Sequence, residues 1–310
     1  MQIIQNAKNG GIFTDFKDIT IQDKEWMQQL FAKSNARACE YCFSNSFNWR
    51  AVYNVKVARM NDFLVVQCTK PIYIYSYPAG SGDIKPVIEA MIQDAKDRNV
   101  PFLMNCILNE NKALLEEIMP GVFDFTAERD VYDYIYTSES LATLAGKKLH
   151  GKRNHINNFI ATYPNWKYEA ITKDNIDECM IMNSKWCDLY GCQDDESLRL
   201  EGCAVKSAFD NFQQLDLVGG LLRAEDDIVA FTIGRPLNSD TFIVHIEKAY
   251  HDIQGAYPMI NQQFILNNAM NFTYVNREDD TGAEGLRKAK LSYRPEILLE
   301  KYSAVLRNTI

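Results

Sequence analysis

The feature that most constrains the fold is a series of elements that occurs twice along the chain. Each half is predicted to run strand, helix, hairpin, strand, glycine-bearing loop, helix and strand. The predicted hairpins cover residues 55–66 and 217–233, where apolar strands flank an acidic or amide-rich turn. The repeat predicts two similar α/β (α+β) domains with mixed, largely antiparallel sheets, at residues 1–160 and 161–310. The alternative is coincidence, since few residues are identical between the halves.

Charge and composition exclude several classes of protein. The chain of 310 residues has 33 basic and 41 acidic residues, a net charge of -8, so its overall field does not attract nucleic acid. No apolar run reaches the roughly 20 residues that span a bilayer, and the first residues lack the pattern of a secretory leader. We therefore expect a cytoplasmic protein without an integral membrane segment and without DNA as a partner.

The eight cysteines do not predict a metal site. Most stand alone among apolar neighbours, which is typical of buried reduced thiols. Cys39 and Cys42 form a Cys-x-x-Cys, but a second ligand pair with zinc-site spacing does not accompany it. We expect no bound metal.

The two glycine loops are candidate anion sites. Each precedes a predicted helix, whose first N–H groups and dipole favour a phosphate. The candidates for binding a donor are Gly80 and Gly82 in the first loop and Gly255 and Ala256 in the second. Neither loop matches the P-loop or the dinucleotide-binding pattern, so a plain turn is the alternative.

A histidine and a carboxylate interrupt the apolar strand predicted at residues 241–248. Strict alternation places His245 and Glu247 together on one face, beside the loop at Gly255. A carboxylate near a pocket can act as a general base, so both residues are catalytic candidates. The alternative is a hydrogen-bonded pair on an edge or a solvent face.

A basic cluster occupies residues 147–155, between the two proposed domains. Lys152, Arg153 and His155 are predicted to grip phosphate groups of a donor, although a charge run is more commonly a solvated helix face. Downstream, residues 276–295 combine both signs of charge with two glycines directly after a predicted strand, which is dense for a connecting loop. Candidates there for binding an anionic group or the donor are Asn276, Arg277, Lys290, Tyr293 and Arg294; a charged capping loop is the alternative.

Three blocks of this sequence carry a resemblance to a known family. They are Gly146 to Phe159, Gln254 to Tyr257, and Asn276 to Asp279 continued by Gly285 to Pro295. In these blocks the chain resembles a bacterial family of uncharacterised proteins related to the C-terminal catalytic domain of phosphatidylglycerol lysyltransferase. The resemblance implies a tandem GNAT-like fold, akin to the Fem aminoacyltransferases that build peptidoglycan bridges.

The resemblance also implies an acyl or aminoacyl transfer from an activated donor to an amine or hydroxyl. The donor is aminoacyl-tRNA, held at Lys152 and Arg153, or acyl-CoA, held at a glycine loop; no other cofactor is expected. The acceptor is a small molecule, a lipid headgroup or a peptide. Asp252 and Tyr257 depart from the Gln/Arg-x-x-Gly-x-Gly/Ala signature by which GNAT proteins hold CoA. The alternatives are an acyl-CoA-dependent N-acetyltransferase and a catalytically inactive GNAT-like binding module.

Overall fold

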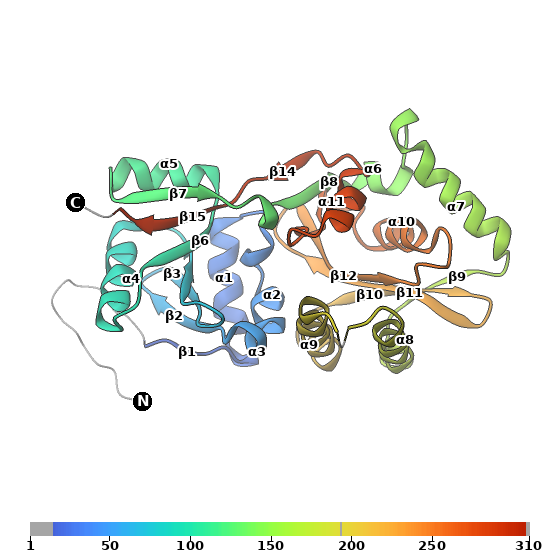
Figure 1. The fold of residues 1–310 in the computed structure, drawn as a ribbon, viewed down its shortest axis with the longest axis horizontal. Coiled ribbons are helices and arrows are strands. Elements are labelled where there is room, and N and C mark those ends of the chain that lie inside the picture. Colours follow the sequence, from blue (N-terminus) through green and yellow to red (C-terminus); the bar gives the residue numbers. More distant parts are fainter. Residues whose placement is uncertain (1–14, 193, 308–310) are drawn as a thin grey trace. The chain divides into compact units, whose positions relative to one another are not determined.

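The structure, a computed structural model, describes residues 15–192 and 194–307. They form two compact units (Figure 1). The first contains the described residues through Tyr132 together with those from Leu299 onward, and the second contains Asp133–Leu298. Each unit has its own mixed sheet, which confirms the predicted mixed α/β class with two sheets.

The first unit joins a twisted sheet to helices that cover it. Its strands are β1 (Lys17–Asp18), β2 (Lys56–Met60), β3 (Phe63–Cys68), β4 (Ile74–Ser76), β5 (Ala79–Gly80), β6 (Leu103–Ile107), β7 (Phe123–Ala127) and β15 (Tyr302–Leu306). Its α-helices are α1 (Lys24–Ser34), α2 (Phe43–Asn48), α3 (Arg50–Tyr53), α4 (Lys85–Asp97) and α5 (Asn109–Ile118), with 3-10 turns η1 (Ile21–Asp23), η2 (Cys39–Tyr41) and η3 (Arg129–Val131). The apolar face of α4 is buried in a core with the sheet, as its helical spacing predicts.

The second unit repeats this plan. Its strands are β8 (Asp133–Thr137), β9 (Lys167–Ala170), β10 (Val218–Ala224), β11 (Asp227–Pro236), β12 (Thr241–Ala249), β13 (Tyr274–Asn276) and β14 (Ile297–Leu299). Its helices are α6 (Ser138–Thr143), α7 (His150–Thr162), α8 (Ile176–Leu189), α9 (Glu196–Asp210), α10 (Ala256–Asn268) and α11 (Glu284–Leu291), with the 3-10 turn η4 (Lys147–Leu149). Figure 1 shows α10 on one face of this sheet and α8 and α9 on the other.

The two sheets have the same strand order. The first runs β1-β2-β3-β4-β6-β15-β7 and the second, from its other edge, β9-β10-β11-β12-β13-β8-β14. The pairs β4–β6 and β12–β13 are parallel, whereas the hairpins β2–β3 and β10–β11 are antiparallel. Both predicted hairpins and the strand following each glycine-loop helix are therefore confirmed. The shared order agrees with the predicted duplication.

The penultimate strand of each sheet comes from a distant part of the chain. In sequence β8 follows β7, yet it pairs with β13 in the second sheet. Likewise β15 follows β14 but lies between β6 and β7 in the first sheet. Because the orders are equivalent, the two sheets have exchanged one strand, as in a domain swap within a single chain.

The unit boundary differs from the predicted division at residue 160. Residues 138–162 form α6 and α7, which pack on α10 of the second unit. Leu141, Ile156 and Phe159 of these helices are buried in the same core as Phe264 of α10. The second unit therefore begins at Asp133, and the last strand returns to the first unit.

No helix among the residues that the structure describes is both long enough and apolar enough to cross a lipid bilayer.

Candidate functional site

The candidate site lies where two parallel strands of the second unit separate. The pairing of β12 with β13 covers Thr241 to Ile243 and ends at the pair Ile243–Asn276. Beyond it β12 continues to Ala249, while the chain after β13 forms the loop that begins at Arg277. Side chains of β12 and of this loop meet in the space between the strands.

A β-bulge in β12 corrects the predicted orientation of His245 and Glu247. The register with β11 shifts so that Ile246 pairs with Ile233 and Val244 with Gly234, which leaves His245 as the extra residue. The bulge reverses the alternation beyond it, and Glu247 contacts α10 on the face that carries Phe242 and Val244. The prediction that His245 and Glu247 lie on one face because they are two residues apart is therefore wrong.

Glu247 is held by two donors from different elements. Its Oε1 accepts a hydrogen bond from Arg277 Nη2 at 2.7 Å, and its Oε2 accepts one from Asn261 Nδ2 at 2.9 Å. Asn261 is a fully buried residue of α10, and the side chains of Glu247 and Arg277 are each only 11% exposed. A charged pair in such a place is stabilised because both partners have charge-assisted hydrogen bonds.

Aromatic rings surround the guanidinium of Arg277. Its Cζ lies 4.8 Å from the ring centre of Tyr293 and 5.7 Å from that of Tyr136, both buried. Lys152 Nζ lies 4.1 Å from the ring centre of Tyr293. Burial and, after it, the positive charge of Arg277 lower the pKa of Lys152. The rings stabilise both cations through cation–π contacts.

Two buried polar atoms at this site have no hydrogen-bond partner among the described residues. They are Arg277 Nη1, a donor, and Asn261 Oδ1, an acceptor. Both belong to side chains that hold Glu247. Since buried polar groups are nearly always paired, the arrangement leaves one donor and one acceptor beside the carboxylate for a bound molecule.

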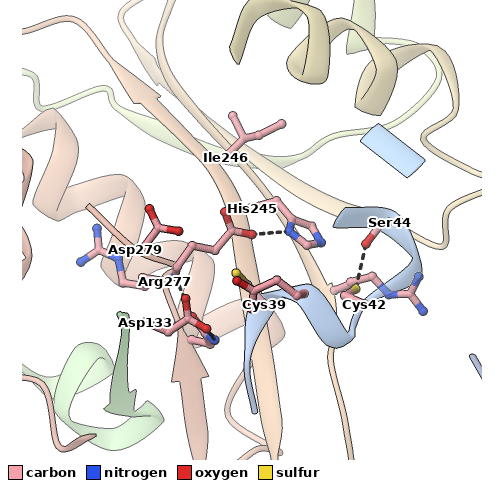
Figure 2. Close-up of polar contacts among 12 residues, drawn as sticks. Cys39, Cys42, Ser44, Asp133, His245, Ile246, Arg277 and Asp279 are labelled. Carbon is pink, nitrogen blue, oxygen red and sulfur yellow. Dashed lines mark hydrogen bonds and ion pairs between the residues drawn. The ribbon is translucent and has the colours of Figure 1, made fainter. Parts of the chain in front are cut away.

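His245 forms a second carboxylate pair. Its Nδ1 lies 2.7 Å from Glu278 Oε1, a contact drawn as a dashed line in Figure 2. Asn276 is fully buried, donates to Asp133 at 2.9 Å and accepts from the Glu278 backbone N–H at 2.6 Å. Asn276 therefore shapes the loop that carries Arg277 and Glu278, and Figure 2 shows Arg277 and Asp279 extending from that loop.

Of the two remaining loop candidates, Lys290 holds the loop and Arg294 does not. Lys290 is buried, and its Nζ donates to the backbone carbonyls of Arg277 and Asp279. Its predicted role as an anion ligand is thus replaced by one in holding the loop. Arg294 is exposed.

The basic residues at 147–155 have different contacts and different exposure. Arg153 Nη1 donates to the backbone carbonyls of Leu144 and Gly146, which closes the turn before α7. Lys152 turns toward Tyr293 instead. The exposed members of the cluster are Lys147, Lys148, His150 and His155.

Packing accounts for the glycine at position 80 of the first loop. A Cβ on Gly80 would lie 2.1 Å from the carbonyl oxygen of Asp62, because β5 pairs with β3 there. Its N–H donates to Ser34 Oγ at 2.7 Å. At the start of α4, the Lys85 N–H donates to Asp83, and Pro86 has no N–H. This helix start offers few groups to a phosphate, and Gly82 lies beside the same acidic residue.

In the second loop, too, packing accounts for the glycine and few backbone N–H groups are free. Gly255 is the N-cap of α10 with φ of 87°, and a Cβ there would lie 2.2 Å from the His155 carbonyl oxygen of α7. The Ala256 N–H donates to the Ile253 carbonyl at 3.1 Å, and Pro258 has no N–H. Close packing of α7 explains this glycine without a ligand.

Sequence reasoning missed Asn261 and Tyr136. Asn261 had a signal, since it stands between Ile260 and Phe264 in a helix that is otherwise apolar on its buried side. Tyr136 had none, because an aromatic residue in a buried strand is ordinary.

Comparisons with solved structures agree with this fold. A conserved protein of unknown function from Bacteroides thetaiotaomicron is 44% identical, with a TM-score of 0.91 over 94% of this chain and 99% of that one. L-PGS from Bacillus licheniformis has a TM-score of 0.66 at 16% identity over 93% of both chains. A tandem GNAT protein from the clavulanic acid pathway has a TM-score of 0.53 at 8% identity over 94% and 98%. The fold is therefore tandem GNAT-like.

Sequence comparison identifies the family. An uncharacterised protein of Mycoplasmoides gallisepticum is 28% identical over 183 residues, which is 55% of this chain and 54% of that protein, so the match spans about half of its length. Residues 31–305 match the family described as "Phosphatidylglycerol lysyltransferase, C-terminal". The chain belongs to this family.

Proposed function

We propose that this protein is an aminoacyltransferase that moves an aminoacyl group from aminoacyl-tRNA to an amine or hydroxyl, with its reaction centre at Glu247. The observation that carries the proposal is the pair of unpartnered atoms beside that carboxylate, Arg277 Nη1 and Asn261 Oδ1. An aminoacyl ester offers both complements, a carbonyl oxygen for the arginine and an ammonium group for the amide oxygen. A plain acetyl group offers only the carbonyl.

The residues suit an acyl transfer to a nucleophile. The acceptor's hydroxyl or amine attacks the ester carbonyl carbon, and Glu247 takes the proton released by the nucleophile. Arg277 donates to the oxygen that becomes negative in the tetrahedral intermediate. The intermediate collapses by breaking the bond to the terminal ribose oxygen of the tRNA, and that oxygen takes up the proton that Glu247 had accepted, which restores the carboxylate. Asn261 orients Glu247, and Tyr136 and Tyr293 hold the arginine in place.

The choice of donor is supported by both helix starts. At α4 and α10 a proline removes one N–H and a second is already bonded, so neither loop is built to hold the pyrophosphate of CoA. The exposed Lys147 and Lys148 beside α7 are better placed to meet tRNA phosphates than Lys152 and Arg153. The family match names phosphatidylglycerol, so its headgroup hydroxyl is the first acceptor to assay.

The test is transfer of radiolabelled amino acids from a mixture of aminoacyl-tRNAs to phosphatidylglycerol vesicles or to a pool of amines. We expect transfer by the native protein and a rate lowered on the order of 10²-fold in Glu247→Gln. Glu284→Gln is the matched control, because that carboxylate is 81% exposed and pairs with Lys288 on its own helix; its rate stays native.

Three results would contradict the proposal. Transfer from acetyl-CoA and not from aminoacyl-tRNA would return the protein to the acyl-CoA alternative. An unchanged rate in Glu247→Gln would remove the catalytic role of that carboxylate, and no transfer from either donor would favour a binding module.

A further inference from the structure

A ring stack in the second unit joins the end of α8 to the loop after β12, with Tyr190 half-buried and His251 exposed. The imidazole of His251 stacks on the ring of Tyr190, with ring centres 4.1 Å apart and planes at 29°. The Tyr190 hydroxyl accepts a hydrogen bond from the His251 backbone N–H at 2.7 Å. His251 remains exposed although it also contacts two further aromatic rings. We call Tyr190 and His251 the ring platform.

Buried contacts fix the base of the platform. Trp186 meets the imidazole edge-on at 6.0 Å and donates from Nε1 to the Ala249 carbonyl at 2.9 Å. Lys248 Nζ lies 3.9 Å from the ring centre of Trp186. On the other side, the hydroxyl of Tyr257 lies 3.5 Å from His251 Nε2. The platform is thus preorganised, so little conformational entropy is lost when a ligand stacks on it.

The platform is near the candidate reaction centre. Tyr257 and Asn261 are four residues apart on α10, so they share one face at a separation of about 6 Å along the helix axis. Asn261 donates to Glu247, whereas Tyr257 contacts His251. A flat group on the platform would therefore lie about one helical turn from the groups around Glu247.

The charges near the platform favour an uncharged flat ring over a phosphate. Asp188 and Asp252 are the exposed acidic residues that flank Tyr190 and His251 in sequence. They repel an anion at this position, but they do not oppose a neutral base. Stacking of a nucleobase on aromatic side chains is a general mode of binding single-stranded nucleic acid.

We infer that the platform of Tyr190 and His251 binds the adenine ring of the acyl donor. This inference rests on the proposed function and deepens it, because the 3′ end of every aminoacyl-tRNA is an adenosine that carries the ester. With the base on the platform, the ester reaches toward Glu247. CoA also carries an adenine, so the ring is the chemistry shared by both donors, and the test separates them.

The test measures binding of three probes by fluorescence anisotropy: an RNA minihelix ending in CCA, the same minihelix ending in CC, and labelled CoA. We expect the native protein to bind the CCA probe more tightly than the CC probe, by on the order of 10-fold. His251→Ala and Tyr190→Ala should each abolish that difference in affinity and leave the affinity for the CC probe unchanged. His251→Phe, which keeps a flat ring and the backbone N–H that bonds to Tyr190, is the matched control and should retain the difference.

The outcomes separate the platform from the proposed function. Equal native affinity for CCA and CC, with no loss of CoA affinity in the alanine variants, overturns the platform. Loss of CoA affinity alone assigns the adenine to CoA and keeps the platform while it contradicts the tRNA donor. A further outcome is that His251→Ala abolishes the difference in affinity between the CCA and CC probes while Glu247→Gln leaves the transfer rate unchanged. In that case the platform is supported and the proposed reaction centre is wrong.

Discussion

At the scale of single residues, Asp280 and Arg287 form an ion pair that stabilises the loop and helix after β13. Asp280 is fully buried, and its carboxylate accepts from Arg287 Nε at 2.9 Å and Nη2 at 2.8 Å and from the hydroxyl of Tyr134. Burial by itself would raise the pKa of Asp280, but these hydrogen bonds outweigh it and hold the pKa well below its usual range. The ionised form is therefore the stable one in the folded protein.

This predicts a pH-dependent effect of Asp280→Asn. A carboxyl whose pKa is lowered by folding stabilises the protein above its unfolded pKa of about 3.9, and this contribution declines as the pH falls below it. We expect urea denaturation to show that the variant loses about 1.5–3 kcal/mol in free energy of unfolding at pH 7, the range for hydrogen bonds to a charged group, and less at pH 3. Asp124→Asn, which breaks an exposed pair with Arg307, should change stability by less than about 1 kcal/mol. An equal loss at both pH values would contradict the account.

At the scale of elements, the contact between α7 and the start of α10 positions the site. Gly255 has φ of 87°, and any Cβ there would overlap the His155 carbonyl oxygen and lie 2.9 Å from Phe159 Cβ. A substitution would be strained in the backbone and would also push the two helices apart. The helix that carries Asn261 depends on this close approach.

We therefore predict that Gly255→Ala lowers the free energy of unfolding by at least about 2 kcal/mol. Gly202→Ala is the control, because Gly202 lies within α9 and no described residue has an atom within 4 Å of its Cβ position; it should be neutral or stabilising by up to about 1 kcal/mol. Urea denaturation measures both. An unchanged free energy of unfolding in Gly255→Ala would contradict the close contact between α7 and the start of α10.

At the scale of the whole molecule, the exchanged strands link the end of the chain to its beginning. In β15, Ala304 is buried in the core of the first unit, whereas Val305 on the opposite face is 44% exposed. A charge at Ala304 would enter that core unpaired. The C-terminal strand should therefore control the stability of the N-terminal unit.

The prediction is that Ala304→Glu reduces amide hydrogen-exchange protection in β2 and β3 much more than in β10 and β11. Val305→Glu, on the same strand, should change neither by more than about 0.5 kcal/mol. If Ala304→Glu exposed β10 and β11 first, the assignment of β15 to the first unit would be wrong.

Features that depend on neighbouring residues could be predicted from short sequence patterns. Alternation and helical spacing act over a few positions, so the hairpins β2–β3 and β10–β11 and the helix α4 could be predicted from them, whereas the repeat predicts α10. Glu247 could be selected because it interrupts an apolar strand, and Arg277 because its loop is densely charged for a connector. The repeated order of elements predicted two similar folds.

The remaining features depend on contacts between distant parts of the chain. The bulge at His245 arises from pairing with β11 and redirects Glu247, whereas alternation within β12 alone points the other way. The pairing of Asn261 with Glu247, and the exchange of β8 with β15, join positions that are distant in sequence. Such choices depend on which apolar faces and polar atoms meet after the chain has closed its loops, and no local pattern contains that information.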